Sequence, residues 1–406
     1  MGKWFMGSVP NLSERVLAAL LRPMMDHRSE EFMEFLKDLI SKVKQVMQTK
    51  AEIVVLTSSA TGGLEAASVN FFEKDDNVIV PVSGYFSEML CKYVRNAGAN
   101  VIKVEAPVGD EPKLDQIERI FERKEKIKAV FTVFDETSTG VTYTWFKEIG
   151  EICNEHGSLF IVDAQPVIGA LNLPVDLYHI DVCVASSQIG IGGPPGLAFI
   201  SLSRKAEELL SRNKPKSRYF DLSLYLSTHK AGQTPFTPAT NIMLATDEAL
   251  KMVLEEGLET RFKRVGICAE AFYSAFEAMG LESVAKKEVR SQLTICIKYP
   301  KGVKEADFKR LLENKYNIYV YGTLKGIPPS FRLGTVGGDP AFREIRVLAS
   351  IAAISSVLNM LGYKVDRGKA LEAAELKLKN YPSFGRTRYN SEYYKARESY
   401  LEATKP

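Results

Sequence analysis

The chain has 406 residues, of which 45% are hydrophobic and 25% are charged, as in an ordinary globular protein with a large core. Its net charge of +3 is small for this length, so the charge gives no reason to expect binding to nucleic acid or to an anionic membrane surface. The five cysteines are scattered along the chain and form no CxxC motif, which argues against a zinc site or a disulfide scaffold.

The first 28 residues contain one short apolar run, which arginine and proline interrupt. This pattern fits neither a signal peptide nor a membrane-spanning helix. We therefore expect a cytoplasmic protein that has no contact with membranes, in which residues 1–20 form an N-terminal arm. Residues 21–264 are expected to form a large domain.

Short apolar segments alternate with amphipathic helical segments between about residues 50 and 200. The segments expected to form strands are 52–57, 77–82, 100–106, 128–134, 158–164, 181–187 and 196–202. Nearly continuous apolar strands that alternate with helices are typical of a mostly parallel sheet covered on both faces. The prediction is an α/β fold with a mostly parallel seven-stranded sheet flanked by helices.

The pattern changes after about residue 265. The apolar segments 293–300, 318–324 and 330–336, a helix over 306–317 and a long helix over 343–361 predict a smaller α+β domain over residues 265–380. Residues 381–406 are polar and rich in tyrosine. This tail is either a docked or frayed terminal helix or a segment that binds a partner.

Ligands of α/β sheets bind at the carboxyl ends of the strands. The segment TSSATGG follows the first strand and places Ser59 and Thr61 where a helix begins. A helix N-terminus directs backbone N–H groups and the positive end of its dipole at an anion such as phosphate. Serine and threonine are also ordinary helix-capping residues, so this feature alone has both interpretations.

Further side chains near the ends of the expected strands could likewise be either structural or ligand-binding. Asp163 ends a buried strand, where its carboxylate needs a partner, for example a protonated ring nitrogen. Phe86 follows another strand and could stack on an aromatic ligand, Thr137 or Ser138 offers a hydroxyl, and Arg332 could bind a carboxylate. Together with the phosphate cradle, they describe a pyridoxal phosphate site for an amino acid.

The chain resembles the class V aminotransferases, which have fold type I among pyridoxal phosphate enzymes, and within them the serine–pyruvate and alanine–glyoxylate branch. The resemblance covers nearly the whole length. It rests on several segments in the same order, namely PMMDHRSEEF, ETSTGV, HGSLFIVDA, PPGLAF, TPFTPATN, FRLGTVG and KVDRGKALEAA. It implies that the cofactor is pyridoxal or pyridoxamine 5'-phosphate and that the ligand is a small amino acid or 2-oxo acid.

The resemblance also implies a role for particular residues. Those that correspond to cofactor-binding positions of the family are Ser59, Ala60 and Thr61 at the phosphate, Phe86 on the ring, Thr137 or Ser138 near the ring oxygen, Asp163 at the ring nitrogen and Gln188 beside the ring. Thr237 corresponds to a residue that reaches the phosphate of the neighbouring subunit, which implies a homodimer with shared sites. Arg332 corresponds to the arginine that binds the substrate carboxylate.

The departures from the family pattern are equally specific. The family motif reads Ser-Gln-Lys, and this chain reads Ser187-Gln188-Ile189. Ala60 replaces the usual glycine of the phosphate loop, and Phe134 replaces a histidine that is common just before the ETSTG motif. Gln165 replaces a small residue that follows the aspartate in the family. Pro166 likewise replaces a small residue.

Isoleucine has no amine that could hold the cofactor covalently or transfer a proton, so Ile189 at this position predicts impaired transamination. Lys147, Lys205 and Lys230 lie in no loop that the family directs at the cofactor. Three hypotheses remain: a pseudoenzyme that binds the cofactor or another ligand without a covalent bond, an enzyme that uses a lysine-independent route, or a non-catalytic subunit that pairs with a lysine-bearing homologue. The cofactor is absent altogether if the cleft has been repurposed.

Overall fold

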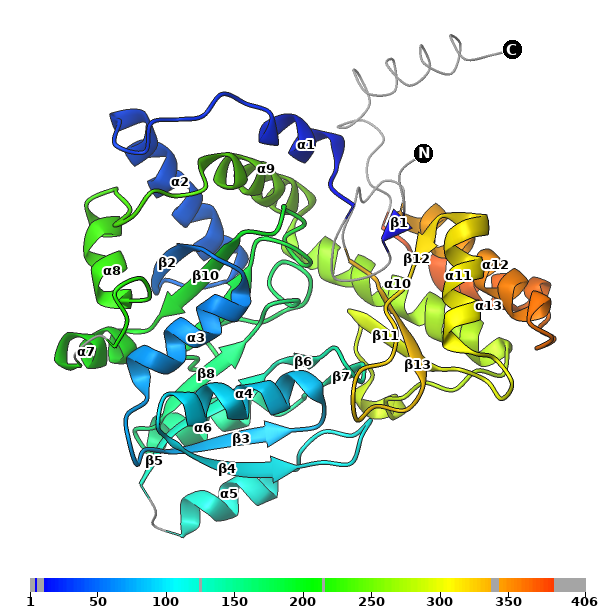
Figure 1. The fold of residues 1–406 in the computed structure, drawn as a ribbon, viewed down its shortest axis with the longest axis horizontal. Helices are drawn as coiled ribbons and strands as arrows, with labels where there is room; N and C mark the ends of the chain where they lie inside the picture. Colours follow the sequence, from blue (N-terminus) through cyan, green and yellow to red (C-terminus); the bar gives the residue numbers. More distant parts are fainter. Residues whose placement is uncertain (1–3, 6–10, 124–125, 214–215, 337–342, 383–406) are drawn as a thin grey trace.

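A seven-stranded sheet forms the centre of the larger lobe, drawn in blue to green in Figure 1. In spatial order its strands are β2 (Glu52–Thr57), β10 (Leu197–Leu202), β9 (Val182–Ser186), β8 (Leu159–Asp163), β5 (Ile127–Val133), β3 (Asn77–Val82) and β4 (Asn100–Glu105). Strand β10 runs antiparallel to both of its neighbours, and every other neighbouring pair is parallel. The predicted mostly parallel sheet is confirmed.

Burial on both faces explains why the central strands of the sheet are mostly apolar. Every residue of β8, β9 and β10 is buried, so helices must cover the sheet on both sides. The helices of this lobe are α2 (Glu30–Val46), α3 (Ala60–Phe71), α4 (Tyr85–Asn96), α5 (Leu114–Glu122), α6 (Phe146–Glu155), α7 (Arg204–Arg212), α8 (Leu222–Lys230) and α9 (Thr240–Glu256). They surround the sheet in Figure 1.

The computed structural model describes residues 4–5, 11–123, 126–213, 216–336 and 343–382. In the expected N-terminal arm, helix α1 (Glu14–Leu20) buries Val16 and Ala19 in the core of the larger lobe. Strand β1 (Trp4–Phe5) instead pairs with β12 (Ile318–Tyr319) of the other lobe.

The second lobe, yellow to orange in Figure 1, has a hydrophobic core of its own, with Phe276, Phe308 and Phe331 at its centre. Its elements are α10 (Leu258–Ala278), the 3₁₀ helix η1 (Lys287–Val289), β11 (Thr294–Lys298), α11 (Glu305–Tyr316), β12, β13 (Ser330–Gly334), α12 (Arg343–Met360) and α13 (Arg367–Leu378). The expected boundary between residues 264 and 265 falls inside α10, which contributes side chains to both cores, so the division into domains stays a prediction. Within the expected tail, residues 383–406 lie outside the described part of the chain.

Two features of this fold bring the predicted ligand-binding segments together. The loops that follow the carboxyl ends of β2, β3, β5, β8 and β9 meet at one edge of the sheet. A short antiparallel pair, β6 (Asp135–Glu136) and β7 (Val141–Thr142), continues from β5 toward the second lobe. The second lobe therefore faces the edge of the sheet where a ligand is expected.

Candidate functional site

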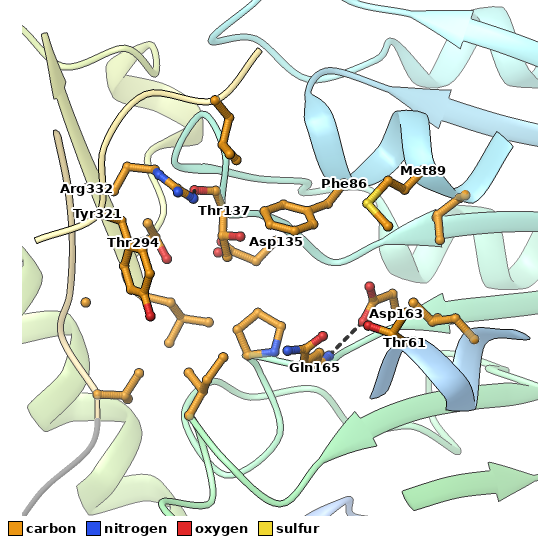
Figure 2. Close-up of a pocket in the computed structure, with 18 of the residues that line it drawn as sticks. Thr61, Phe86, Met89, Asp135, Thr137, Asp163, Gln165, Thr294, Tyr321 and Arg332 are labelled. Carbon is orange, nitrogen blue, oxygen red and sulfur yellow. Dashed lines mark hydrogen bonds between the residues drawn. The ribbon is translucent and has the colours of Figure 1, made fainter. Parts of the chain in front are cut away.

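A cavity of about 380 Å³ lies between the two lobes, at the carboxyl ends of the strands. Its lining residues from the larger lobe are Thr61, Leu64, Phe86, Met89, Leu90, Tyr93, Asp135, Thr137, Asp163, Gln165, Pro166 and Ile189. From the second lobe come Leu293, Thr294, Tyr321, Leu324, Arg332, Leu333, Gly334 and Val336. Figure 2 shows these side chains around a shared opening, with Arg332 and Tyr321 at one end and Thr61 and Asp163 at the other. None of these residues is a lysine.

The first turn of α3 provides the expected place for an anion. Ser59 precedes the helix in extended conformation, yet its hydroxyl makes no capping hydrogen bond. Thr61 lines the cavity, while Ser59 and Ala60 adjoin it without lining it. A helix start of this kind, uncapped by its own serine, suits a negatively charged group.

Phe86 is held in the first turn of α4 by a buried carboxylate. Glu136 accepts hydrogen bonds from the backbone N–H groups of Phe86 (3.2 Å) and Ser87 (2.7 Å). Ser138 takes part in the same network, because its hydroxyl donates to Glu136 and accepts from the Tyr85 N–H. The motif ETSTG therefore fixes the position of the aromatic ring, with Thr137 in the cavity lining and Ser138 behind it.

Asp163 is the last residue of β8, and its side chain is 8% exposed. Its one hydrogen bond among the described residues is accepted from the Gln165 N–H at 3.0 Å, drawn as the dashed line in Figure 2. Burial raises the pKa of this carboxyl to about 7, the Gln165 N–H opposes that shift, and the charge of Glu136 adds to it. A buried carboxyl with no cation beside it is suited to receive a positively charged ligand atom.

Ile189 lines the cavity in a left-handed backbone conformation, with φ of 58°. A β-branched side chain is strongly disfavoured in this region, so the surrounding structure must hold the loop in place. Arg261 does this from α10, because its guanidinium donates to the backbone oxygens of Gly169 and Gly190. Its charge is balanced by Glu256, at 2.7 Å.

Gln188 and Thr237 lie elsewhere. The Gln188 side chain does not line the cavity, and its Oε1 atom is buried without a hydrogen-bond partner among the described residues. Thr237 is exposed and also lies outside the lining. Within one chain, the structure therefore brings together Thr61, Phe86, Thr137, Asp163 and Ile189, but not these two.

Arg332 lies on β13, with an exposed fraction of 8%. Its Nε atom donates to the Gly322 oxygen and its Nη1 atom to the Thr137 oxygen, both at 3.2 Å. The guanidinium carbon lies 5.6 Å from the centre of the Tyr321 ring. No carboxylate forms an ion pair with Arg332 in the described part of the chain, and burial lowers its pKa. An anionic ligand would supply the missing charge.

Sequence reasoning missed Asp135, which lines the same cavity and is 4% exposed. Its Oδ1 atom accepts a hydrogen bond from the Thr142 hydroxyl at 2.5 Å, while its Oδ2 atom is buried without a partner among the described residues. Burial raises its pKa to about 7, an effect that the Ser291 and Thr142 hydroxyls oppose. In the sequence, Asp135 precedes Glu136 shortly after an apolar strand, but these residues alone do not show that Asp135 faces a cavity.

Other classes of site find no support in the described residues. No group of three or more His, Cys, Asp or Glu side chains there could hold a metal ion. In the same part of the chain, no helix is long and apolar enough to cross a membrane.

Comparison with known proteins identifies the family of this chain over most of its length. Residues 8–332 match the model of the family described as aminotransferase class-V. An uncharacterized aminotransferase of Methanocaldococcus jannaschii is 36% identical over 90% of this chain and 94% of its own. The serine–glyoxylate aminotransferase of Methylorubrum extorquens is 31% identical over 93% and 96%. The crystal structure of ureidoglycine–glyoxylate aminotransferase from Bacillus subtilis superposes with a TM-score of 0.86 at 30% identity, over 93% of this chain and 98% of that one.

Proposed function

Because the chain belongs to the class V aminotransferase family, whose members imply a pyridoxal or pyridoxamine phosphate cofactor, we propose that its cleft binds such a cofactor without a covalent bond. We further propose that Ile189 occupies the position of the family's lysine, so that the protein is a ligand-binding homologue with impaired transamination. The observation that carries this proposal is a cavity with a cofactor-compatible lining that contains Ile189 and no lysine.

The residues at one end of the cavity are compatible with the cofactor. Asp163 would face the protonated ring nitrogen, because its buried carboxyl has no cationic partner among the described residues. Phe86 would stack on the ring from the position that Glu136 gives it. The uncapped first turn of α3 at Thr61 would hold the phosphate.

The opposite end suits a carboxylate. Arg332 is buried and has no ion pair among the described residues, and its fork of N–H donors matches a carboxylate. When bound, the cofactor supplies an electron-withdrawing ring that eases loss of a proton from the carbon next to an amine. Arg332 would then orient a small amino acid or 2-oxo acid with respect to the ring.

Impairment follows from the side chain at position 189. Isoleucine neither accepts nor donates a proton, and general acid–base help of this kind is worth about 10²–10⁴-fold in rate. The other lysines considered from the sequence are engaged outside the lining: Lys147 with Glu151, Lys205 with Asp181 and Lys230 with Glu207. Retained binding with little turnover is the expected behaviour.

A lysine-independent enzyme is the second candidate. Asp163 and Arg332, which have no ion pair among the described residues, support it against a purely structural subunit, which would need neither side chain. Addition of serine or alanine to protein loaded with pyridoxal phosphate distinguishes the two candidates, because only the enzyme would convert the bound vitamer to pyridoxamine phosphate, which mass analysis detects.

We also propose a homodimer, in which exposed Thr237 reaches the cleft of the second copy, as the family pattern implies. The alternative is a heteromer in which this chain is the non-catalytic subunit and the partner is a lysine-bearing homologue. Sedimentation of the pure protein tests the first arrangement. Co-purification with a lysine-bearing homologue from the source cells would replace it with the second.

The decisive experiment measures cofactor retention. We would incubate the protein with pyridoxal phosphate and, separately, with pyridoxamine phosphate, desalt each sample and quantify the bound vitamer by absorbance and mass. Near-stoichiometric retention is expected, with strong loss in Asp163→Ala. No retention of either vitamer by the wild-type protein would contradict the proposal.

The companion variant is Ile189→Lys. Restored transamination in this variant, together with a mass increase that marks a covalent bond to the cofactor, is expected if Ile189 occupies the lysine position. Ile191→Lys, two residues along the same loop, is the matched control and should gain neither property.

A further inference from the structure

Asp135 brings a buried carboxyl to the cavity that Arg332 also lines, and a cationic ligand atom beside it would favour its charged form. One of its carboxylate oxygens has no hydrogen-bond partner among the described residues, although the side chain is only 4% exposed. Buried polar atoms are nearly always satisfied, so an orphaned carboxylate oxygen in a cavity lining indicates a missing partner. The partner must donate a hydrogen bond, and a cation would serve best, because Thr142 and Ser291 offer Asp135 only uncharged hydroxyls and the neighbouring Glu136 is itself acidic.

Arg332 is the complementary half of this arrangement. Its Nη1 atom binds the backbone oxygen of Thr137, two residues from Asp135, and its Nη2 atom makes no hydrogen bond among the described residues. Asp135 and Arg332 both line the same cavity, so a single ligand can contact both side chains. The structure does not pair Asp135 with Arg332, and both remain available to a ligand.

The surroundings limit the size and polarity of that ligand. The nearby lining from the second lobe is largely apolar and includes Leu293, Leu324 and Val336. In Figure 2, Asp135 lies between Arg332 and Phe86, hence between the carboxylate-binding end and the ring that would stack on the cofactor. An α-amino acid fits this arrangement, because its carboxylate would bind Arg332 and the nitrogen on the adjacent carbon would lie near Asp135.

We propose that Asp135 binds the ammonium group of a zwitterionic ligand whose carboxylate binds Arg332, so that the cleft prefers a short aliphatic amino acid to the corresponding amine-free acid. This inference rests on the proposed function for the site and adds a specificity-determining residue to it. In this chain the ammonium group of the ligand would be held by its charge pair with Asp135. A relative with a lysine in its site can instead use covalent chemistry.

Ligand titration tests the inference without any turnover. The vitamer-free protein would be titrated by calorimetry with L-alanine, L-lactate and pyruvate, and the alanine and lactate titrations would be repeated with pyridoxamine phosphate present. Wild-type protein is expected to bind alanine at least tenfold more tightly than lactate or pyruvate, since a hydrogen-bonded charge pair contributes a factor of about ten or more.

Three variants separate a specific role from a structural one. Asp135→Asn, which keeps the shape and can still accept from Thr142, should weaken alanine binding about tenfold and leave lactate and pyruvate within twofold. Arg332→Gln should weaken all three ligands. Asp110→Asn, which alters a buried carboxyl outside the cavity, should change none of them.

Two results would overturn the inference: equal affinities of the wild-type protein for all three ligands, including no binding of any, or an equal loss for all three in Asp135→Asn. The vitamer-retention experiment reports independently on the proposed function. If the protein retains a vitamer but does not prefer alanine to lactate and pyruvate, only the role of Asp135 is disproved. If it prefers alanine but retains no vitamer, only the proposal of a bound cofactor is disproved.

Discussion

The molecule contains two clusters of buried charge that are built in opposite ways. At the start of α10, Glu256 accepts from Arg261 at 2.7 Å and from Arg264 at 2.6 Å, and all three side chains are at least 94% buried. In the cavity, by contrast, Asp163 and Arg332 have no ion-pair partner among the described residues. The first cluster is complete within the protein, whereas the second requires something from outside.

This difference separates structural charges from ligand-binding ones. A paired buried charge has its desolvation penalty offset by its partner, so it can hold two segments together. An unpaired buried charge destabilises the empty protein and is relieved only when a ligand brings the opposite charge. Charge alone does not mark a site, and the missing partner is the informative feature.

The largest effect is expected where the complete cluster is broken. Glu256→Gln leaves two buried guanidinium groups without a carboxylate and should lower the free energy of unfolding by about 3–5 kcal/mol. Urea denaturation measures this loss. Glu255→Gln is the adjacent control, because its partner Arg15 is much more exposed and such pairs contribute about 1 kcal/mol or less. Similar losses in both variants would erase the contrast between the clusters.

A smaller effect of the opposite sign is expected in the incomplete cluster. The pKa of Asp163 is about 7 in the folded protein and near 3.8 in the unfolded chain, so unfolding releases a proton between these pH values. The wild-type protein therefore loses stability from this group as pH rises from 3.8 to 7. The melting temperature of Asp163→Asn should equal that of the wild-type protein near pH 4 and exceed it by on the order of 3 °C at pH 8.

The control for this pH dependence is Asp110→Asn. Lys286 and the Glu111 N–H lower the pKa of Asp110, whose charged form therefore stabilises the fold above its unfolded pKa. This variant should be less stable than wild type at pH 8. A melting temperature of Asp163→Asn below that of wild type at pH 8 would mean that the carboxylate has a partner in the protein after all.

The smallest effect concerns the backbone beside the incomplete cluster. Ile189→Leu keeps the apolar side chain but removes the β-branch from a residue with φ of 58°, and should raise the free energy of unfolding by about 1 kcal/mol. Ile191→Leu is the matched control. It lies in the same loop without a positive φ and is 2% exposed, so reshaping it should lower stability by about 1 kcal/mol. Denaturation midpoints of the two variants should move in opposite directions.

The fold could be predicted because burial acts on whole strands. Segments such as 158–164 and 196–202 are mostly apolar and do not alternate with polar residues, a pattern that is typical of strands in a sheet covered on both faces. The division into lobes could not be located as well. Helix α10 runs through the expected boundary, and one continuous helix gives no turn signal at the point where its environment changes.

Site residues could be predicted from the sequence where a charged residue lies in an otherwise apolar segment. Asp163 interrupts an apolar strand, which is visible without a structure. Asp135 was missed because its environment comes from Thr142 and Ser291, the second of which is far away in the chain. The left-handed conformation at Ile189 was equally hidden, since isoleucine is among the residues least suited to it.

The attachment of Arg261 to the backbone oxygens of Gly169 and Gly190 has a consequence for how this loop can evolve. Both contacts are made to main-chain atoms, which every amino acid possesses. These contacts do not depend on which side chain stands at position 189, so a substitution there alters the chemistry presented to the cavity while the contacts persist. A single substitution is therefore enough to place a reactive group here, without rebuilding the protein around it.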